Sequence, residues 1–123
     1  MGDAQITNCL VSGEIVFAVR PQLPPQAALR VQLLDTSYAD APATVLAAEV
    51  FTDIAADANQ GKPLPFSLYG PAPNPRISCT VSAHVALQGS DRVQPGDYRN
   101  TQSYPVITYG YPDRVSIRVE RIG

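Results

Sequence analysis

The side chains that could perform acid–base, nucleophilic or metal chemistry are few. The 123 residues include one histidine, His84, and two cysteines, Cys9 and Cys79. A zinc site of four Cys and His ligands needs more such side chains than this chain supplies. Any Ser-His-Asp or Cys-His group would have to use His84 as a base oriented by a third residue. We interpret His84 as an inert surface residue and predict that the protein is not an enzyme.

One acidic segment carries part of a calcium-binding pattern. Asp57, Asn59 and Gly61 have the alternating spacing of an oxygen-ligand loop. An EF-hand loop needs glycine at its sixth position and glutamate at its twelfth. Lys62 and Leu68 occupy those positions, so a polar turn is the better interpretation.

Asp35 and Asp40 could be considered as paired carboxylates for glycoside hydrolysis. That chemistry needs two carboxyl groups at a fixed separation across a sugar-binding cleft. The chain contains no tryptophan, which argues against an aromatic sugar platform. We therefore expect no catalytic residue, no metal site and no cofactor.

Alternation of apolar and polar residues predicts short strands in place of helices. Twelve prolines and eight glycines interrupt the chain and disfavour long helices. Pro63 and Pro65 lack amide donors, so the strand that contains Pro65 should lie at a sheet edge. A short helix is the alternative for residues 44–52, the expected third strand. Residues 54–56 could form one helical turn. The expected strands cover residues 9–19, 28–35, 44–52, 64–68, 76–87, 101–109 and 114–120.

Seven short strands separated by turns predict an all-β fold in one domain. The expected architecture is a seven-stranded antiparallel β-sandwich with Greek-key topology, immunoglobulin-like or prealbumin-like. A closed barrel is the alternative. Residues 1–8 are expected to form a flexible N-terminal segment, and residues 9–123 the single domain.

Charge and hydrophobicity narrow the classes of partner. Nine basic and eleven acidic residues give a net charge of −2, whereas nucleic-acid binders usually carry a basic excess. No apolar run reaches the roughly 18 residues of a transmembrane helix. We expect neither a nucleic-acid partner nor a transmembrane segment.

The two cysteines lie on the predicted first and fifth strands, and alternation points both side chains inward. In an immunoglobulin-type order these strands would be about 9.5 Å apart, too far for a disulfide. We predict two free thiols, with Cys79 buried and Cys9 partly accessible, although an oxidising compartment would favour a bridge.

Several blocks of sequence identify a family resemblance. The longest begins with Leu-Pro-Pro at 23–25, continues through a strand ending Leu34-Asp35-Thr36-Ser37, and closes with Ala-Asp-Ala-Pro-Ala at 39–43. Shorter blocks are residues 11–15, 63–68 and 103–108. Together they resemble the YscW/YbaY family of type III secretion lipoprotein chaperones over about residues 11–119.

The resemblance implies a small β-sandwich that a lipidated N-terminal cysteine holds at the outer membrane. Some family members act as pilots for a secretin ring. We therefore expect a non-enzymatic module of the periplasm or outer membrane that binds another envelope protein such as a secretin. A small-molecule or glycan-binding envelope module is the alternative. No signal peptide or lipobox precedes Cys9, so either the leader lies outside this sequence or this member stays in the cytoplasm.

Candidate protein-contact residues come from loops and from the last strand. Loops on a rigid scaffold carry much of protein function, and tyrosine is enriched at interfaces. Arginines on an outward strand face could form a docking stripe for an acidic or helical partner. A purely structural role is the alternative for the loop after residue 34, and a solvated face for the last strand. The candidates are Asp35, Ser37, Tyr38, Asp40, Tyr109, Tyr111, Arg114 and Arg118.

Overall fold

The structure, a computed structural model, describes residues 8–38 and 40–123. Seven strands and one short helix form within these residues. The expected flexible segment lies outside them except for its last residue, Asn8, where the first strand begins. The elements are β1 (Asn8–Phe17), β2 (Ala28–Asp35), β3 (Thr44–Phe51), α1 (Ala55–Asn59), β4 (Leu64–Gly70), β5 (Cys79–Ala86), β6 (Tyr98–Asn100) and β7 (Arg114–Arg121).

The strands form one sheet in the order β3-β2-β5-β6-β7-β1-β4. The prediction of a seven-stranded all-β fold is confirmed. The expectation that every pair is antiparallel is wrong at one place, because β1 and β7 run parallel. Alternation along a strand reports which residues face the core but not the direction of the neighbouring strand. Here the whole domain acts as the long connection that a parallel pair requires.

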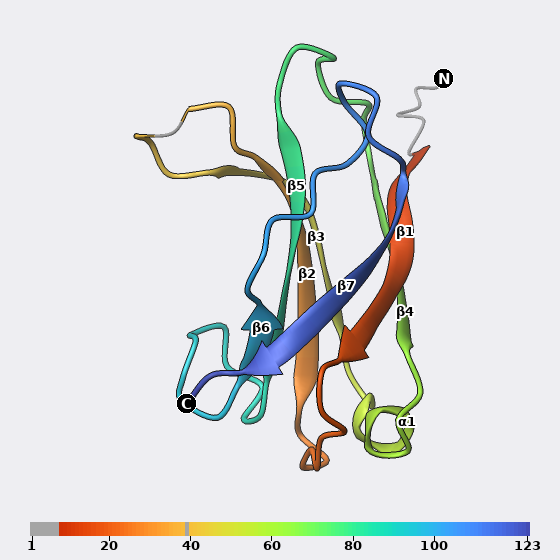
Figure 1. Cartoon of the computed structure of the whole chain (residues 1–123), viewed down its shortest axis with the longest axis vertical. Coiled ribbons are helices and arrows are strands. Elements are labelled where there is room, and N and C mark those ends of the chain that lie inside the picture. Colours follow the sequence, from red (N-terminus) through yellow and green to blue (C-terminus); the bar gives the residue numbers. More distant parts are fainter. Residues whose placement is uncertain (1–7, 39) are drawn as a thin grey trace, which may run out of the picture.

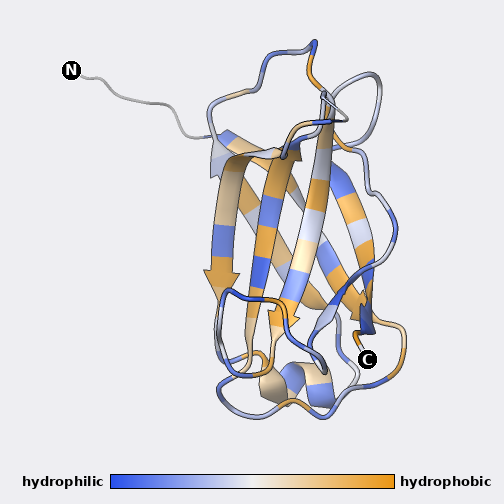
Figure 2. Cartoon of the chain, turned by 90° about the vertical axis from the view of Figure 1, so that its left-hand side faces the viewer, coloured by the Kyte–Doolittle hydropathy of each residue, from blue (hydrophilic) through white to orange (hydrophobic). Residues whose placement is uncertain are grey.

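The sheet curls until its two edge strands, β3 and β4, lie beside one another, so that it closes almost into a barrel (Figure 1). The prediction that the proline-containing β4 is an edge strand is confirmed. Helix α1 covers the lower end, where Ile54 and Ala58 are buried (Figures 1 and 2). Among the described residues, no helix has the length and apolarity needed to cross a membrane.

Alternating side chains build the core. On β2, Leu33 is fully buried, whereas its neighbours Gln32 and Leu34 are half-buried. The same alternation of apolar and polar residues is visible along the strands in Figure 2. The inward face expected for residues 79–85 of β5 is confirmed. The largest fully buried side chains are Ile15, Leu29, Leu33, Leu68 and Ile117.

Gly13 permits the close approach of β1 to β7. A Cβ atom placed on Gly13 would lie 1.7 Å from the carbonyl oxygen of Val115 and 2.8 Å from its carbonyl carbon. These are backbone atoms that cannot move aside without disrupting the strand pair. The parallel register therefore requires glycine at position 13.

Residues 101–109, expected as the sixth strand, do not form one. The strand at this place in the chain is β6, Tyr98–Asn100, and the later segment contributes only an isolated bridge between Thr80 and Pro105. Pro105 has no amide to donate, and Ile107 and Tyr109 have left-handed φ angles that end extended structure.

Two strand ends also differ from expectation. β5 begins at Cys79 because residues 74–77 form a turn closed by the Ile77 amide on the Asn74 carbonyl, at 3.2 Å. β1 ends at Phe17, so Val19 is 76% exposed and does not face the core.

Cys9 does not point inward as expected. The pairing of β1 with β4 shifts between Cys9 and Val11, and this β-bulge places both Leu10 and Val11 in the core. The extra residue reverses the alternation before it, so Cys9 is exposed. The prediction that Cys79 is buried is confirmed, and both sulfurs are free thiols.

Candidate functional site

Three connections meet at the upper end of the barrel in Figure 1: residues 36–38 and 40–43 after β2, residues 71–78 after β4, and residues 101–113 before β7. Hydrogen bonds join them. The Ser78 amide donates to Ser37 Oγ at 2.9 Å, and the Thr36 amide donates to the Ser78 carbonyl at 2.8 Å. The Tyr109 hydroxyl donates to the Arg76 carbonyl. The loop end is therefore one connected surface.

A groove of about 520 Å³ opens in this surface, and we call it the end groove. Two of the predicted contact residues form part of its wall, Tyr109 at 65% exposed and Tyr111 at 50%. Aromatic rings this exposed offer a large apolar area to a partner. The remaining wall is mostly apolar and comes from β1, the loop after β4 and the segment before β7: Asn8, Cys9, Leu10, Ala72, Pro73, Pro75, Ile107, Thr108 and Asp113.

The backbone around the two tyrosines takes an uncommon conformation. Ile107 has φ 56°, Tyr109 φ 55° and Gly110 φ 83°, all in the left-handed region. For a β-branched residue such as Ile107 this conformation is a clear outlier, and each such residue costs on the order of 1–3 kcal/mol. Hydrogen bonds hold it: the Ile107 amide donates to the Pro112 carbonyl at 3.0 Å, and the Tyr111 amide to the Thr108 carbonyl at 3.1 Å.

Thr108 carries a polar group without a partner. Its residue is 7% exposed, and its Oγ1 is the one buried side-chain oxygen or nitrogen in the described part of the chain that makes no hydrogen bond. Burial raises the pKa of the neighbouring Cys79 thiol, and Thr108 lowers it by a smaller amount, although the two groups lack the geometry of a hydrogen bond. A buried hydroxyl left unpaired is unfavourable, so Thr108 is a locally destabilising residue of this segment.

The predicted contact residues at the loop after β2 differ in role: two hold the turn and two are exposed. Asp35 accepts hydrogen bonds from the Ser37 hydroxyl at 2.5 Å and the Ser37 amide at 3.0 Å. These bonds lower the pKa of Asp35 and fix the turn, which gives both residues a structural role. Tyr38, 74% exposed, and the exposed Asp40 lie further out on this loop, which projects away from the barrel in Figure 1.

The two arginines of β7 lie on its exposed face at different depths. Arg114 begins the strand beside Ser12 and directly follows Asp113 of the groove wall. Arg118 lies four residues along, roughly 13 Å down the strand. The structure therefore places Tyr109, Tyr111 and Arg114 together at the loop end, while Arg118 lies on the side of the barrel.

His84 is not the surface residue that its position suggested. Its side chain is 12% exposed, and its Nε2 lies 2.8 Å from Oδ2 of Asp97, which is 4% exposed. Burial alone would raise the pKa of Asp97, but hydrogen bonds from His84 and from the Leu87 and Gln94 amides lower it below its usual value. The ionised carboxylate only accepts, so Nε2 carries the proton. The loop that follows β5 folds back over the strand and covers the ring.

Side chains within residues 57–61, which have the calcium-like spacing, make structural contacts. Asn59 Oδ1 accepts from the Leu23 amide at 2.6 Å, and Asn59 Nδ2 donates to the Leu23 carbonyl at 3.0 Å. Asp57 lies 3.9 Å from Lys62 Nζ. These contacts attach α1 to the chain before β2. Across residues 8–38 and 40–123, no group of three or more His, Cys, Asp or Glu side chains could hold a metal ion.

Sequence reasoning missed several residues that shape these sites. Thr108 and Ile107 were assigned to a strand, and Asp97 to a loop without a role. The Tyr-Gly-Tyr-Pro run at 109–112 signalled a turn but not the groove beside it. The groove walls come from segments more than 30 residues apart, so no local pattern could reveal them.

Comparison with known proteins gives three consistent matches. The model of the family described as type III secretion system lipoprotein chaperone (YscW) matches residues 7–119. The uncharacterized lipoprotein YbaY of Escherichia coli K12 is 38% identical over 96 residues, a match that covers 69% of this chain and 46% of that protein. The matched part thus spans less than half of the relative's length.

The third match is structural. An alternative pilotin from the type II secretion system of Vibrio cholerae superposes with a TM-score of 0.77 at 27% identity, covering 95% of this chain and 98% of that chain. The likeness extends over nearly the whole chain. With a family model that spans nearly the whole sequence, the chain belongs to the YscW family of type III secretion system lipoprotein chaperones.

Proposed function

We propose that this protein is a non-enzymatic chaperone of the cell envelope that binds a segment of another envelope protein, such as a secretin, in the end groove. The observation that carries the proposal is the groove itself, whose wall is mostly apolar and leaves Tyr109 and Tyr111 exposed. Membership of a chaperone family and the fold of a pilotin support this role.

The groove chemistry defines the segment it would take. Two tyrosines provide rigid apolar surface with polar tips, which suits apolar side chains of a partner. The other wall residues, which are mostly apolar, extend this preference. We therefore expect a short, mainly apolar segment.

Charged and polar residues around the groove would extend the contact. Arg114, beside the groove, would favour an acidic residue flanking the apolar segment, and Arg118 would continue that preference down β7. Tyr38 and Asp40 would contact a partner that also covers the loop after β2. Asp35 and Ser37 would act indirectly by fixing that loop.

The same proposal places the protein in the periplasm or at the outer membrane, as the family name suggests. We also propose that the protein catalyses no reaction. His84 is oriented by Asp97 as a catalytic base would be, but no nucleophilic side chain of the described residues forms a hydrogen bond with the ring. Purified protein should therefore give no turnover of ester, glycan or phosphoester substrates, and activity lost on His84→Ala would contradict this.

The binding proposal is tested by affinity capture from envelope extract with three versions of the protein. The Tyr109→Ala/Tyr111→Ala variant should lose the captured partner, because removal of anchor residues typically costs 2 kcal/mol or more, about 30-fold in affinity. Tyr69→Ala is the matched control: Tyr69 is 53% exposed on β4, outside the end groove. It should capture the partner as the unmodified protein does.

Circular dichroism would establish that all three versions are folded. Equal capture by all three would contradict the proposal. Loss of capture with Tyr69→Ala alone would also contradict it and would indicate that the partner binds at the β3–β4 edge. A small shallow cleft of about 370 Å³ at that edge is lined by Phe51, Phe66 and Tyr69 together with Glu49, Pro65 and Ser67.

A further inference from the structure

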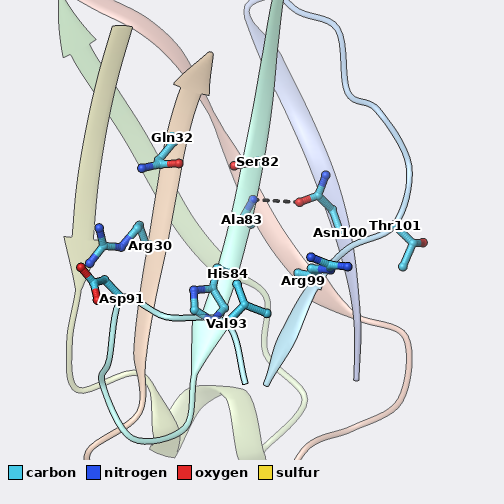
Figure 3. Close-up of a pocket in the computed structure, with 10 residues that line it drawn as sticks. All are labelled: Arg30, Gln32, Ser82, Ala83, His84, Asp91, Val93, Arg99, Asn100 and Thr101. Atoms are coloured by element: carbon cyan, nitrogen blue, oxygen red, sulfur yellow. Dashed lines mark hydrogen bonds between the residues drawn. The ribbon is translucent and has the colours of Figure 1, made fainter. Parts of the chain in front are cut away.

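A second cavity lies on the side of the barrel, and we call it the side pocket. Its floor is a row of basic residues abreast on three neighbouring strands: Arg30 of β2 is in register with His84 of β5, and His84 with Arg99 of β6 (Figure 3). Gln32 and Ser82, also in register, form the next row. The pocket has a volume of about 560 Å³.

Among the described residues neither arginine of the floor forms an ion pair, although the Asp91 carboxylate lines the same pocket. Within residues 8–38 and 40–123 the ion pairs are Lys62 with Asp57 and His84 with Asp97, so no carboxylate lies within pairing distance of either guanidinium. Arg30 is also half-buried. Like charges gathered on one face of a sheet are destabilising, and burial increases the cost. An anion in the side pocket would remove that cost.

The walls of the side pocket are held by hydrogen bonds that do not involve the arginines. Asp97 fixes His84 at 2.8 Å and the loop after β5 through the Gln94 amide at 3.0 Å. Asn100 Oδ1 accepts from the Ala83 amide at 2.9 Å, and its Nδ2 donates to the Gln102 carbonyl at 2.9 Å. A cavity with fixed walls and free guanidinium groups is preorganised for a ligand.

We propose that the side pocket binds a small polar molecule through an oxyanion, a phosphate or a carboxylate, held between Arg30 and Arg99. The backbones of these residues are roughly 9.5 Å apart, two strand spacings, and both residues line the same cavity, so their long side chains can reach one oxyanion within it. Guanidinium groups match phosphate and carboxylate oxygens in geometry as well as charge.

The other lining residues define the rest of the ligand. Gln32 and Ser82 offer hydrogen bonds to hydroxyl or amide groups. Asp91 on the covering loop reduces the net formal charge of the pocket from +2 to +1, which suits a single oxyanion. No phenylalanine, tyrosine or tryptophan is among its lining residues, which disfavours a stacked sugar or base. This site goes beyond the proposed chaperone function, because it is distinct from the end groove in place and chemistry.

The test is amide NMR of the full chain titrated at constant ionic strength with inorganic phosphate and with gluconate, against sodium chloride. A parallel arm uses vesicles of phosphatidylglycerol, with phosphatidylcholine vesicles as the comparison, to distinguish a lipid headgroup from a free anion. Arg30→Gln and Arg99→Gln are the test variants. Arg92→Gln is the matched control, because it makes the same charge change on the covering loop but Arg92 does not line the pocket.

We expect saturable shifts at the amides of Arg30, His84 and Arg99 with an oxyanion and none with chloride. Each test variant should weaken binding about tenfold or more, and Arg92→Gln less than about twofold. The same pattern of variants with phosphatidylglycerol vesicles alone would support a lipid headgroup as the source. Absence of binding in both arms, or equal weakening by Arg92→Gln, would overturn the proposal.

Discussion

The end groove and the side pocket lie on one barrel but are made in opposite ways. The end groove is built from loops, with left-handed residues at 107, 109 and 110 and exposed tyrosines. The side pocket is built on three paired strands, with its charged floor set by register. The groove presents a mostly apolar wall, whereas the pocket presents two arginines that form no ion pair among the described residues.

The difference shows how one small core can support two recognition chemistries. Strand residues alternate, so each inward apolar side chain is followed by an outward one that is available for polar recognition. Loops at the strand ends are free of that alternation and can present adjacent aromatic residues. The two sites should therefore respond separately to substitutions on the surface and together to substitutions in the core.

The largest effect should come from a substitution in the core, because the core supports both sites. Leu33 is fully buried on β2, so Leu33→Ala should lower the free energy of unfolding by about 2–5 kcal/mol, measured by urea denaturation. Both sites would lose their support at once. Gln32→Ala, one residue away and facing the side pocket, should cost about 0.5 kcal/mol or less. Equal costs would show that the register of β2 is wrong.

A smaller effect should come from Asp97, which holds His84 in the floor of the side pocket. Asp97→Asn weakens the hydrogen bonds to His84, Leu87 and Gln94 and should lower the free energy of unfolding by about 1–3 kcal/mol at neutral pH. The pKa of Asp97 is lowered on folding, so its stabilisation is present above the unfolded value and is lost as pH falls through the folded value.

Denaturation curves at pH 7 and at pH 3 would check the sign of this dependence. The difference between the unmodified protein and Asp97→Asn should shrink at the lower pH. Asp35→Asn is the comparison at the loop end: the pKa of Asp35 is also lowered, but the group is exposed and the loss should be smaller. A difference for Asp97→Asn that grew on acidification would contradict the assigned hydrogen bonds.

The smallest effect should be a difference in reactivity between the two thiols, with no change in the free energy of unfolding. Cys9 lines the end groove and is exposed, whereas Cys79 is buried and its pKa is raised by that burial. A thiol reagent should therefore modify one group in the native protein and two in denaturant. Cys9→Ser should abolish the native reaction. Two groups reacting at equal rates without denaturant would show that Cys79 is not held in the core.

The strands could be predicted wherever burial follows the period of two. In β2, β5 and β7 most inward residues have at least one polar neighbour, and the predicted faces of Leu33, Val81 and Ile117 are confirmed. The period fails where the backbone departs from a regular strand. The bulge after Cys9 and the left-handed residues Ile107 and Tyr109 have no signature in hydrophobicity.

The sites were harder to predict because they depend on distant pairings. Tyr109 and Tyr111 could be chosen as contact residues from their type alone, but Thr108 becomes unusual only when the fold buries its hydroxyl. His84 and Asp97 are 13 residues apart and meet because a loop folds back over β5. The row of Arg30, His84 and Arg99 requires the register of three strands.

The central claim is that a segment of another envelope protein lies in the end groove, and site-specific photo-crosslinking in the cell envelope tests it most directly. A photoreactive phenylalanine analogue would replace Tyr111 in one version and Tyr69 in another, since both positions are about half exposed. We predict a crosslink to an envelope protein from position 111, weakened by Tyr109→Ala, and none to that protein from position 69. Crosslinks of equal strength from both positions, or none from position 111, would contradict the claim.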